Sequence, residues 1–96
     1  MIAIREKKNI PLGRLVITPP AESLLRKAGK SCQRFLDRHA SGDWGDIPSD
    51  DWANNDDAVD NGGILHSAYT VHGQDRIWII TESDRSVTTI LLPDDY

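Results

Sequence analysis

The last third of the chain carries the pattern that most restricts the fold, an alternation of apolar and other side chains between turn signals. The alternating segments are residues 64–71 (ILHSAYTV), 76–81 (RIWIIT) and 87–92 (VTTILL), separated by HGQD and ESDRS and closed by a proline. Alternation with a period of two is typical of β-strands, and short polar connections favour antiparallel neighbours. The pattern therefore predicts a three-stranded antiparallel meander.

The middle strand of this meander is apolar on both sides. Ile77 and Ile79 fall on one face, and Trp78 and Ile80 fall on the other, because successive side chains of a strand point to opposite faces. Such a strand is typical of a central position in a sheet with both faces covered. We expect helices on one face and a loop or a partner on the other.

The residues before the meander predict one strand and three helices. Residues 12–18 (LGRLVIT) are rich in apolar and β-branched types and suit a strand that joins the meander at an edge. Thr18, Ser31 and Ser49 are candidate N-caps for the three helices. We expect a single α+β domain over residues 1–96, with a three- to four-stranded antiparallel sheet, two or three N-terminal helices and a mobile basic arm at residues 1–11.

The second predicted helix places Cys32, Phe35, Leu36 and His39 on one face, because these positions follow the 3.6-residue period. We interpret Cys32 as a core residue rather than a nucleophile. His39 falls in the last turn, where a partly protonated imidazole would meet the negative end of the helix dipole. The spacing of the three histidines matches no metal site, so we expect neither a metal nor another cofactor.

Composition excludes several classes of protein. No apolar run approaches the roughly 20 residues that cross a bilayer, so we expect no membrane span. The charges near the start follow a very short apolar patch, whereas a secretory signal places them before a longer one. A single cysteine excludes an internal disulfide and fits a reducing compartment. We therefore expect a cytoplasmic protein.

Charge is divided unevenly along the chain. Residues 1–38 hold nine Lys or Arg and three acids, while residues 39–96 hold two and twelve, which gives +6 and −10. Asymmetry of this size is typical of a protein with a charged partner, the alternative being surface charge that serves solubility. In an alternative, the two regions contact each other, within one molecule or between the copies of a homodimer. Direct binding to nucleic acid is disfavoured, because the whole chain is acidic and no helix-turn-helix pattern is evident.

The third predicted helix is the strongest candidate for a binding surface. Residues 43–60 contain seven aspartates and no Lys or Arg. Four of them fall within an arc of about 120° on the helix. They are Asp50, Asp56, Asp57 and Asp60. With Asp51 added, the five charges over eleven residues are spaced by about 3.3 Å along the axis, which resembles one DNA strand, with about 3.4 Å per charge. We interpret this face as a surface for a basic, nucleic-acid-binding protein, the alternative being a solvated face.

The segment between the last two strands is predicted to be a hairpin turn, since Ser, Asp and Glu stabilise reversals of the chain. Glu82 and Arg85 are close enough in sequence for an exposed ion pair. Glu82, Asp84 and Arg85 are added to the candidate partner-binding residues. A catalytic or metal-binding role of Glu82 and Asp84, together with His66, is the alternative.

From residue 12 to residue 96 the chain resembles a family of small proteins encoded on bacterial plasmids and other mobile elements. The likeness runs through LGRLVITP, RHASGDWGD, SAYTVHG, IWIITESDRSVTTILLP and the final DDY. The chain departs from the family pattern at His66, where an aliphatic residue is typical. Some members carry the name of a restriction enzyme's modification subunit, but this chain lacks the length and the Gly-rich cofactor loop that methyl transfer needs.

The patterns predict a non-catalytic interaction protein with an acidic surface, and the resemblance implies a mobile genetic element and, with it, inhibition of a DNA-directed host defence system of the CRISPR or restriction type. Two alternatives from other classes stay open. One is a small hydrolase or metal-dependent enzyme that uses the 82–85 hairpin. The other is a DNA-binding accessory factor for plasmid maintenance.

Overall fold

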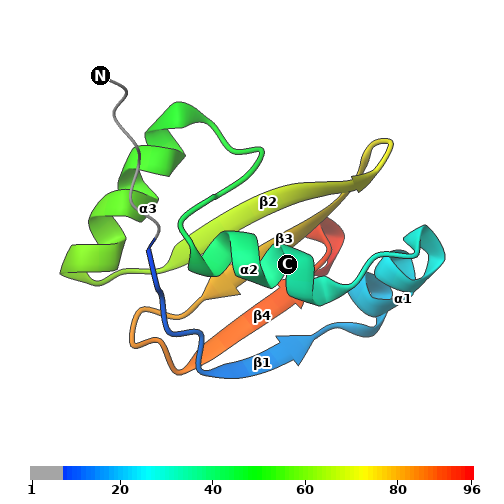
Figure 1. Ribbon diagram of the computed structural model, residues 1–96, viewed down its shortest axis with the longest axis horizontal. Coiled ribbons are helices and arrows are strands. Elements are labelled where there is room, and N and C mark those ends of the chain that lie inside the picture. The colour runs from blue at the N-terminus through cyan, green and yellow to red at the C-terminus, as the bar shows by residue number, and fades with distance from the viewer. Residues whose placement is uncertain (1–7) are drawn as a thin grey trace.

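The predicted meander forms strands β2 (Leu65–His72), β3 (Asp75–Thr81) and β4 (Val87–Leu91) of the computed structural model, which describes residues 8–96 (Figure 1). The other elements are β1 (Arg14–Ile17), α1 (Pro19–Ala28), α2 (Cys32–Ala40), α3 (Ser49–Asn61) and a final 3-10 turn, η1 (Pro93–Asp95). The α+β class and the edge position of the first strand are confirmed.

The sheet is mixed rather than fully antiparallel, and its strand order is β1-β4-β3-β2. Strands β2, β3 and β4 pair antiparallel as predicted, but β1 pairs with β4 in parallel, with Arg14 opposite Val87 and Ile17 opposite Ile90. Hairpin connections force antiparallel pairing, whereas three helices and two strands separate β1 from β4 along the chain. The long return path removes that constraint, and the prediction of a purely antiparallel sheet was wrong at this strand.

The predicted N-caps differ in what their side chains do. The Thr18 hydroxyl accepts a hydrogen bond from the amide of Ala21 at 3.3 Å, so α1 is capped as expected. Ser31 occupies the N-cap position of α2 without a side-chain bond, and Ser49 is the first residue of α3, after Pro48 at the cap. The three helices therefore start close to their predicted positions.

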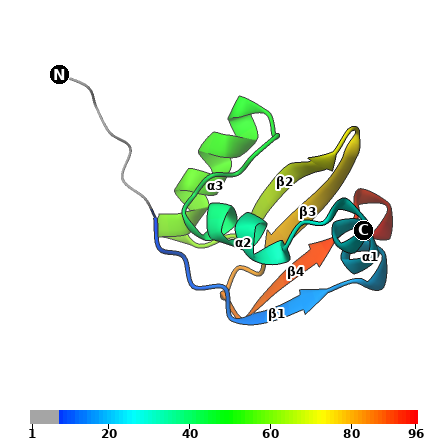
Figure 2. The same cartoon turned by 45° about the vertical axis from the view of Figure 1, so that its right-hand side comes forward.

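Helices α1 and α2 cover one face of the sheet (Figures 1 and 2). Ile77 and Ile79 of the central strand are fully buried there, in a cluster with Leu25, Phe35 and Leu36. A second apolar cluster lies under α3, and it contains Ile10, Trp44, Ala58 and Leu65. Trp78 and Ile80, on the opposite face of β3, are only half-buried. Helices therefore cover one of the two apolar faces of β3, as expected.

A network of hydrogen bonds in the interior connects His39 with Ser67, Thr81 and Thr88. Thr88 donates its hydroxyl to the carbonyl of Leu12 at 2.7 Å and so accepts from Thr81 at 2.8 Å. Thr81 then accepts from Nε2 of His39 at 2.8 Å, and the Ser67 hydroxyl donates to Nδ1 at 2.5 Å. A neutral imidazole protonated at Nε2 satisfies every member of the network. Burial lowers the pKa of His39 to about 4, so the predicted partial protonation is wrong.

The described part of the predicted basic arm is anchored to the fold. The amides of Lys8 and Ile10 donate to the carbonyls of Ser41 and Ala40 at 3.1 and 3.0 Å, and Ile10 is buried. These residues therefore differ from the expected mobile arm, whose residues 1–7 lie outside the described part of the chain. Within residues 8–96, no helix has the length and apolarity that crossing a bilayer requires.

Candidate binding surface

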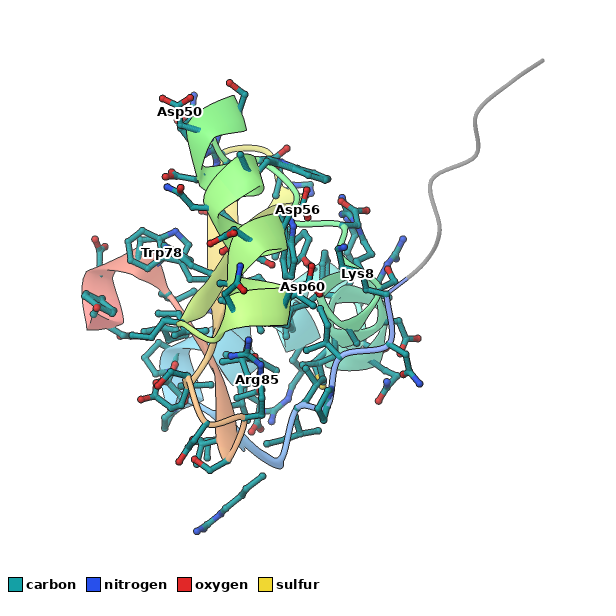
Figure 3. The ribbon with its side chains drawn as sticks, turned by 90° about the vertical axis from the view of Figure 1, so that its left-hand side faces the viewer. Lys8, Asp50, Asp56, Asp60, Trp78 and Arg85 are labelled. Atoms are coloured by element: carbon teal, nitrogen blue, oxygen red, sulfur yellow. The ribbon has the colours of Figure 1, made fainter. Side chains whose placement is uncertain are left out.

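Helix α3 projects beside the sheet and carries three exposed carboxylates on one side, with the exposed Asp51 about 100° away from Asp50 around the helix. Figure 3 shows Asp50 at its outer tip and Asp60 near the sheet. Asp50, Asp57 and Asp60 are exposed and, at 100° per residue, lie within about 80° around the helix. We call these three residues the acidic surface. Within residues 8–96 the ion pairs are Glu22–Arg26 and Arg38–Asp43, so no described cation pairs with the acidic surface.

Asp56 was predicted on the same face but has a structural role. Its carboxylate accepts a hydrogen bond from the indole N–H of Trp44 at 3.0 Å. Trp44 is fully buried, and an indole N–H without an acceptor in such a place would be costly. Asp56 is at the edge of the predicted arc, half-buried against the loop before α3. Asp56 therefore stabilises the fold and is not counted in the acidic surface.

The predicted hairpin turn between Thr81 and Val87 is confirmed. The amide of Glu82 donates to the carbonyl of Val87 at 3.0 Å, which closes the hairpin. The Asp84 carboxylate accepts hydrogen bonds from both the amide and the hydroxyl of Ser86 at 3.0 and 2.5 Å. These bonds hold the pKa of the exposed Asp84 carboxyl below its ordinary value. The interactions of Asp84 are those of a turn residue.

Arg85 binds backbone carbonyls rather than forming the expected ion pair with Glu82. Its guanidinium donates to the carbonyls of Ala58 at 2.8 Å and Gly63 at 2.6 Å, at the end of α3. It also donates to the carbonyls of Glu82 and Ser83. The carbonyls at a helix C-terminus lack partners within the helix and attract a cation. Arg85 therefore fastens the hairpin to α3.

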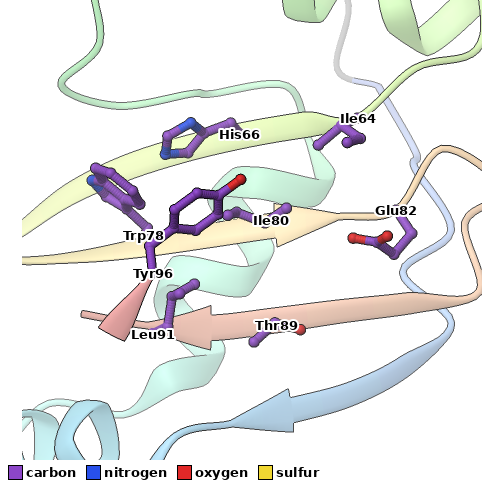
Figure 4. A pocket seen from close by; sticks show the side chains of 8 residues that line it. All are labelled: Ile64, His66, Trp78, Ile80, Glu82, Thr89, Leu91 and Tyr96. Atoms are coloured by element: carbon purple, nitrogen blue, oxygen red, sulfur yellow. The ribbon is translucent and has the colours of Figure 1, made fainter. Parts of the chain in front are cut away.

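The face of the sheet opposite α1 and α2 contains a groove of about 530 Å³ (Figure 4). His66, Trp78, Ile80, Thr89 and Leu91 line it from the three meander strands. Ile64, Glu82 and Tyr96 complete its lining. Figure 4 shows Trp78 and Tyr96 at one end and Ile64 and Glu82 at the other. The alternation in β3 predicted this second apolar face, but not that it would form a groove.

His66 is the polar group of the groove whose hydrogen bonding is incomplete. Its Nε2 is buried and has no partner in the part of the chain that the structure describes. The ring lies edge-on to Trp78, with 4.5 Å between the ring centroids, and Trp78 in turn contacts Tyr96. Burial lowers the pKa of His66, and the negative charge of the nearby Asp51 partly offsets this decrease. The imidazole ring of His66 is therefore part of the apolar lining of the groove, and one of its nitrogens has no hydrogen-bond partner among the described residues.

The residues of the enzymatic alternative do not all meet in the groove. His66 and Glu82 both line it, whereas Asp84 is exposed and bonded within the turn. No group of three His, Cys, Asp or Glu among residues 8–96 is arranged to hold a metal ion. Cys32 packs half-buried against the main core. The structure therefore brings together two of the three residues, His66 and Glu82, as part of the groove lining.

Comparison with known proteins gives no family for this chain. No family model matches it, and neither does any curated protein or solved structure. Its two candidate contact regions, the acidic surface and the groove, therefore supply the structural basis for a functional proposal.

Proposed function

We propose that the protein is a non-catalytic interaction module that binds a basic, nucleic-acid-binding protein through the acidic surface. The observation that carries the proposal is that Asp50, Asp57 and Asp60 are exposed on one side of α3 and unpaired by any cation of residues 8–96. Carboxylates held on a helix keep their spacing when a partner arrives, so their attraction to a cationic groove requires little reorganisation.

The partner that we propose is the DNA-binding groove of a host defence enzyme, either a CRISPR effector or a restriction endonuclease. The resemblance to proteins of plasmids and other mobile elements supports this choice, because such elements are targets of those enzymes. An acidic ligand competes with DNA for the same cations. Attraction of this kind accelerates association and weakens as salt increases.

The proposal is tested by mixing the protein with a purified effector of each kind at low salt. DNA binding, followed by fluorescence anisotropy, and DNA cleavage are expected to fall as the protein is added, and added salt is expected to relieve the inhibition. Replacing Asp50, Asp57 and Asp60 by Lys should raise the inhibitory concentration about tenfold or more, since each lost ion pair is worth about 0.2–1 kcal/mol.

A matched control carries the same charge change elsewhere. Glu22, Asp37 and Asp75 are exposed on α1, α2 and β3, and their replacement by Lys should leave inhibition within about threefold of the wild type. The proposal is refuted if DNA binding and cleavage are unchanged by excess protein at low salt. Equal inhibition by the two triple variants would exclude the acidic surface as the contact.

A further inference from the structure

The outward face of β3 carries four side chains in a row, and this row is complementary to the same row running in the opposite direction. Arg76, Trp78 and Ile80 share this face, since the isoleucines that alternate with them are fully buried under the helices. Glu82 follows at the same spacing and lines the far end of the groove (Figure 4). The row therefore reads cation, aromatic, aliphatic, anion.

Both charged ends of the row are available to a partner. Arg76 and Glu82 are exposed, and neither forms an ion pair with another residue in 8–96. The apolar ends of the groove are also accessible, because Ile64 is 58% and Tyr96 is 83% exposed. An apolar groove flanked by an unpaired cation and an unpaired anion indicates an interaction surface.

We propose that this face binds a second copy of the chain in a symmetric dimer. Consider a two-fold axis that lies between the two sheets, perpendicular to β3 and level with Ile79. The two β3 strands then run antiparallel, and residues equally far from Ile79 on either side face each other. Arg76 of one copy meets Glu82 of the other, and Trp78 meets Ile80. Each contact occurs twice.

The charge pattern selects a second copy over other occupants. A partner that is only basic pairs Glu82 and leaves Arg76 without a counter-charge, and a strand of nucleic acid is repelled by Glu82. A second copy satisfies both charges and buries the apolar groove between two sheets, which pack about 10 Å apart in such arrangements. Figure 3 shows Trp78 and Asp60 on opposite sides of α3, with Asp50 at the outer tip of the helix, so the dimer leaves Asp60 accessible.

The test is sedimentation equilibrium of the full chain over micromolar to millimolar concentrations. The mass is expected to rise from 10.7 kDa towards twice that value. Replacing Glu82 by Arg, or Arg76 by Glu, should raise the dimer dissociation constant about tenfold, because one substitution creates two like-charge contacts. The double variant exchanges the charges and should return to within about threefold of the wild type.

Two further variants separate this proposal from the proposed function. Trp78→Ala should weaken the dimer about tenfold or more, as expected for a central aromatic anchor, with circular dichroism to confirm folding. Replacing Asp50, Asp57 and Asp60 by Lys should leave the dimer unchanged while removing inhibition of the effector.

Several results would overturn the dimer. One is a monomer at all concentrations, and another is a dimer that tolerates both single charge reversals. A double variant that stays monomeric would refute the pairing of Arg76 with Glu82. A monomer whose Trp78 indole resonance shifts on addition of a single-stranded oligonucleotide or a basic peptide would assign the groove to that ligand instead.

Discussion

Acidification from about pH 7 to about pH 5 is expected to remove about 2 kcal/mol of folding free energy through the buried side chain of His39. Burial lowers the pKa of His39 from 6.5 to about 4 in the folded protein. Between these two values the unfolded state binds a proton that the folded state does not. The contribution is therefore complete above pH 6.5 and is lost as the pH falls towards 4.

The magnitude follows from the separation of the two pKa values. One pKa unit corresponds to about 1.4 kcal/mol. The difference between 6.5 and about 4 therefore sets a limit of about 3 kcal/mol, of which about two thirds is lost by about pH 5. His39 is fully buried, so solvent screens this effect little. A small domain has about 5–10 kcal/mol of stability, which makes the loss readily measurable.

Urea unfolding of the wild type and of His39→Gln at a series of pH values measures the effect. The glutamine amide can donate to Thr81 and accept from Ser67 as the imidazole does, but it does not titrate in this range. The variant should therefore lose the pH dependence that His39 contributes. His66, whose pKa burial also lowers, is present in both proteins, so its contribution cancels in the difference.

The Cε1 proton of His39 provides a direct check by NMR, with an expected titration midpoint near 4. A midpoint close to 6.5 would refute the argument that burial disfavours the imidazolium. The same conclusion would follow if His39→Gln retained the full pH dependence of the wild type, because the slope would then arise elsewhere.

Three further substitutions test contacts of the fold, each by the free energy of unfolding in urea. Asp56→Ala should cost about 1–3 kcal/mol by leaving the indole N–H of Trp44 unsatisfied, whereas Asp56→Asn keeps an acceptor and should cost less. Arg85→Ala should cost about 1.5–3 kcal/mol through its lost bonds to the end of α3, and an unchanged stability would refute that role. Gly45→Ala should cost at least about 2 kcal/mol, because a Cβ there would lie 2.1 Å from the carbonyl oxygen of Ala68 at a φ of 76°. A Gly45→Ala protein as stable as the wild type would show that this loop moves freely.

The local patterns of the sequence predicted the elements and the faces of the central strand. Alternation around Trp78 identified the two apolar faces of β3, but it did not indicate which of them the helices cover. The direction of β1 was not predictable in this way, because strand pairing across a long connection depends on the path of the intervening helices. Local pattern therefore determined the strands, and chain topology determined how they are joined.

The acidic surface was predicted only in part, because the contacts of its candidate residues also depend on parts of the chain that are distant in sequence. A helical projection places Asp56 within the same arc as Asp57, but it contains no information about Trp44, which reaches Asp56 from a loop twelve positions earlier. Arg85 was similarly interpreted from its neighbours, whereas its partners lie 22 and 27 positions away. Side chains whose contacts are distant in sequence were those that the prediction misplaced.

The pairing of β1 with β4 has a consequence for biosynthesis. Thr88 of β4 and Leu12, which precedes β1 and accepts a hydrogen bond from Thr88, lie 76 positions apart. The N-terminal strand thus leaves the ribosome long before its neighbour is translated, and its backbone must stay solvated until the last strand emerges. Leu15 and Val16 of this strand are exposed even in the folded protein, so the edge stays open to non-native pairing until β4 is available.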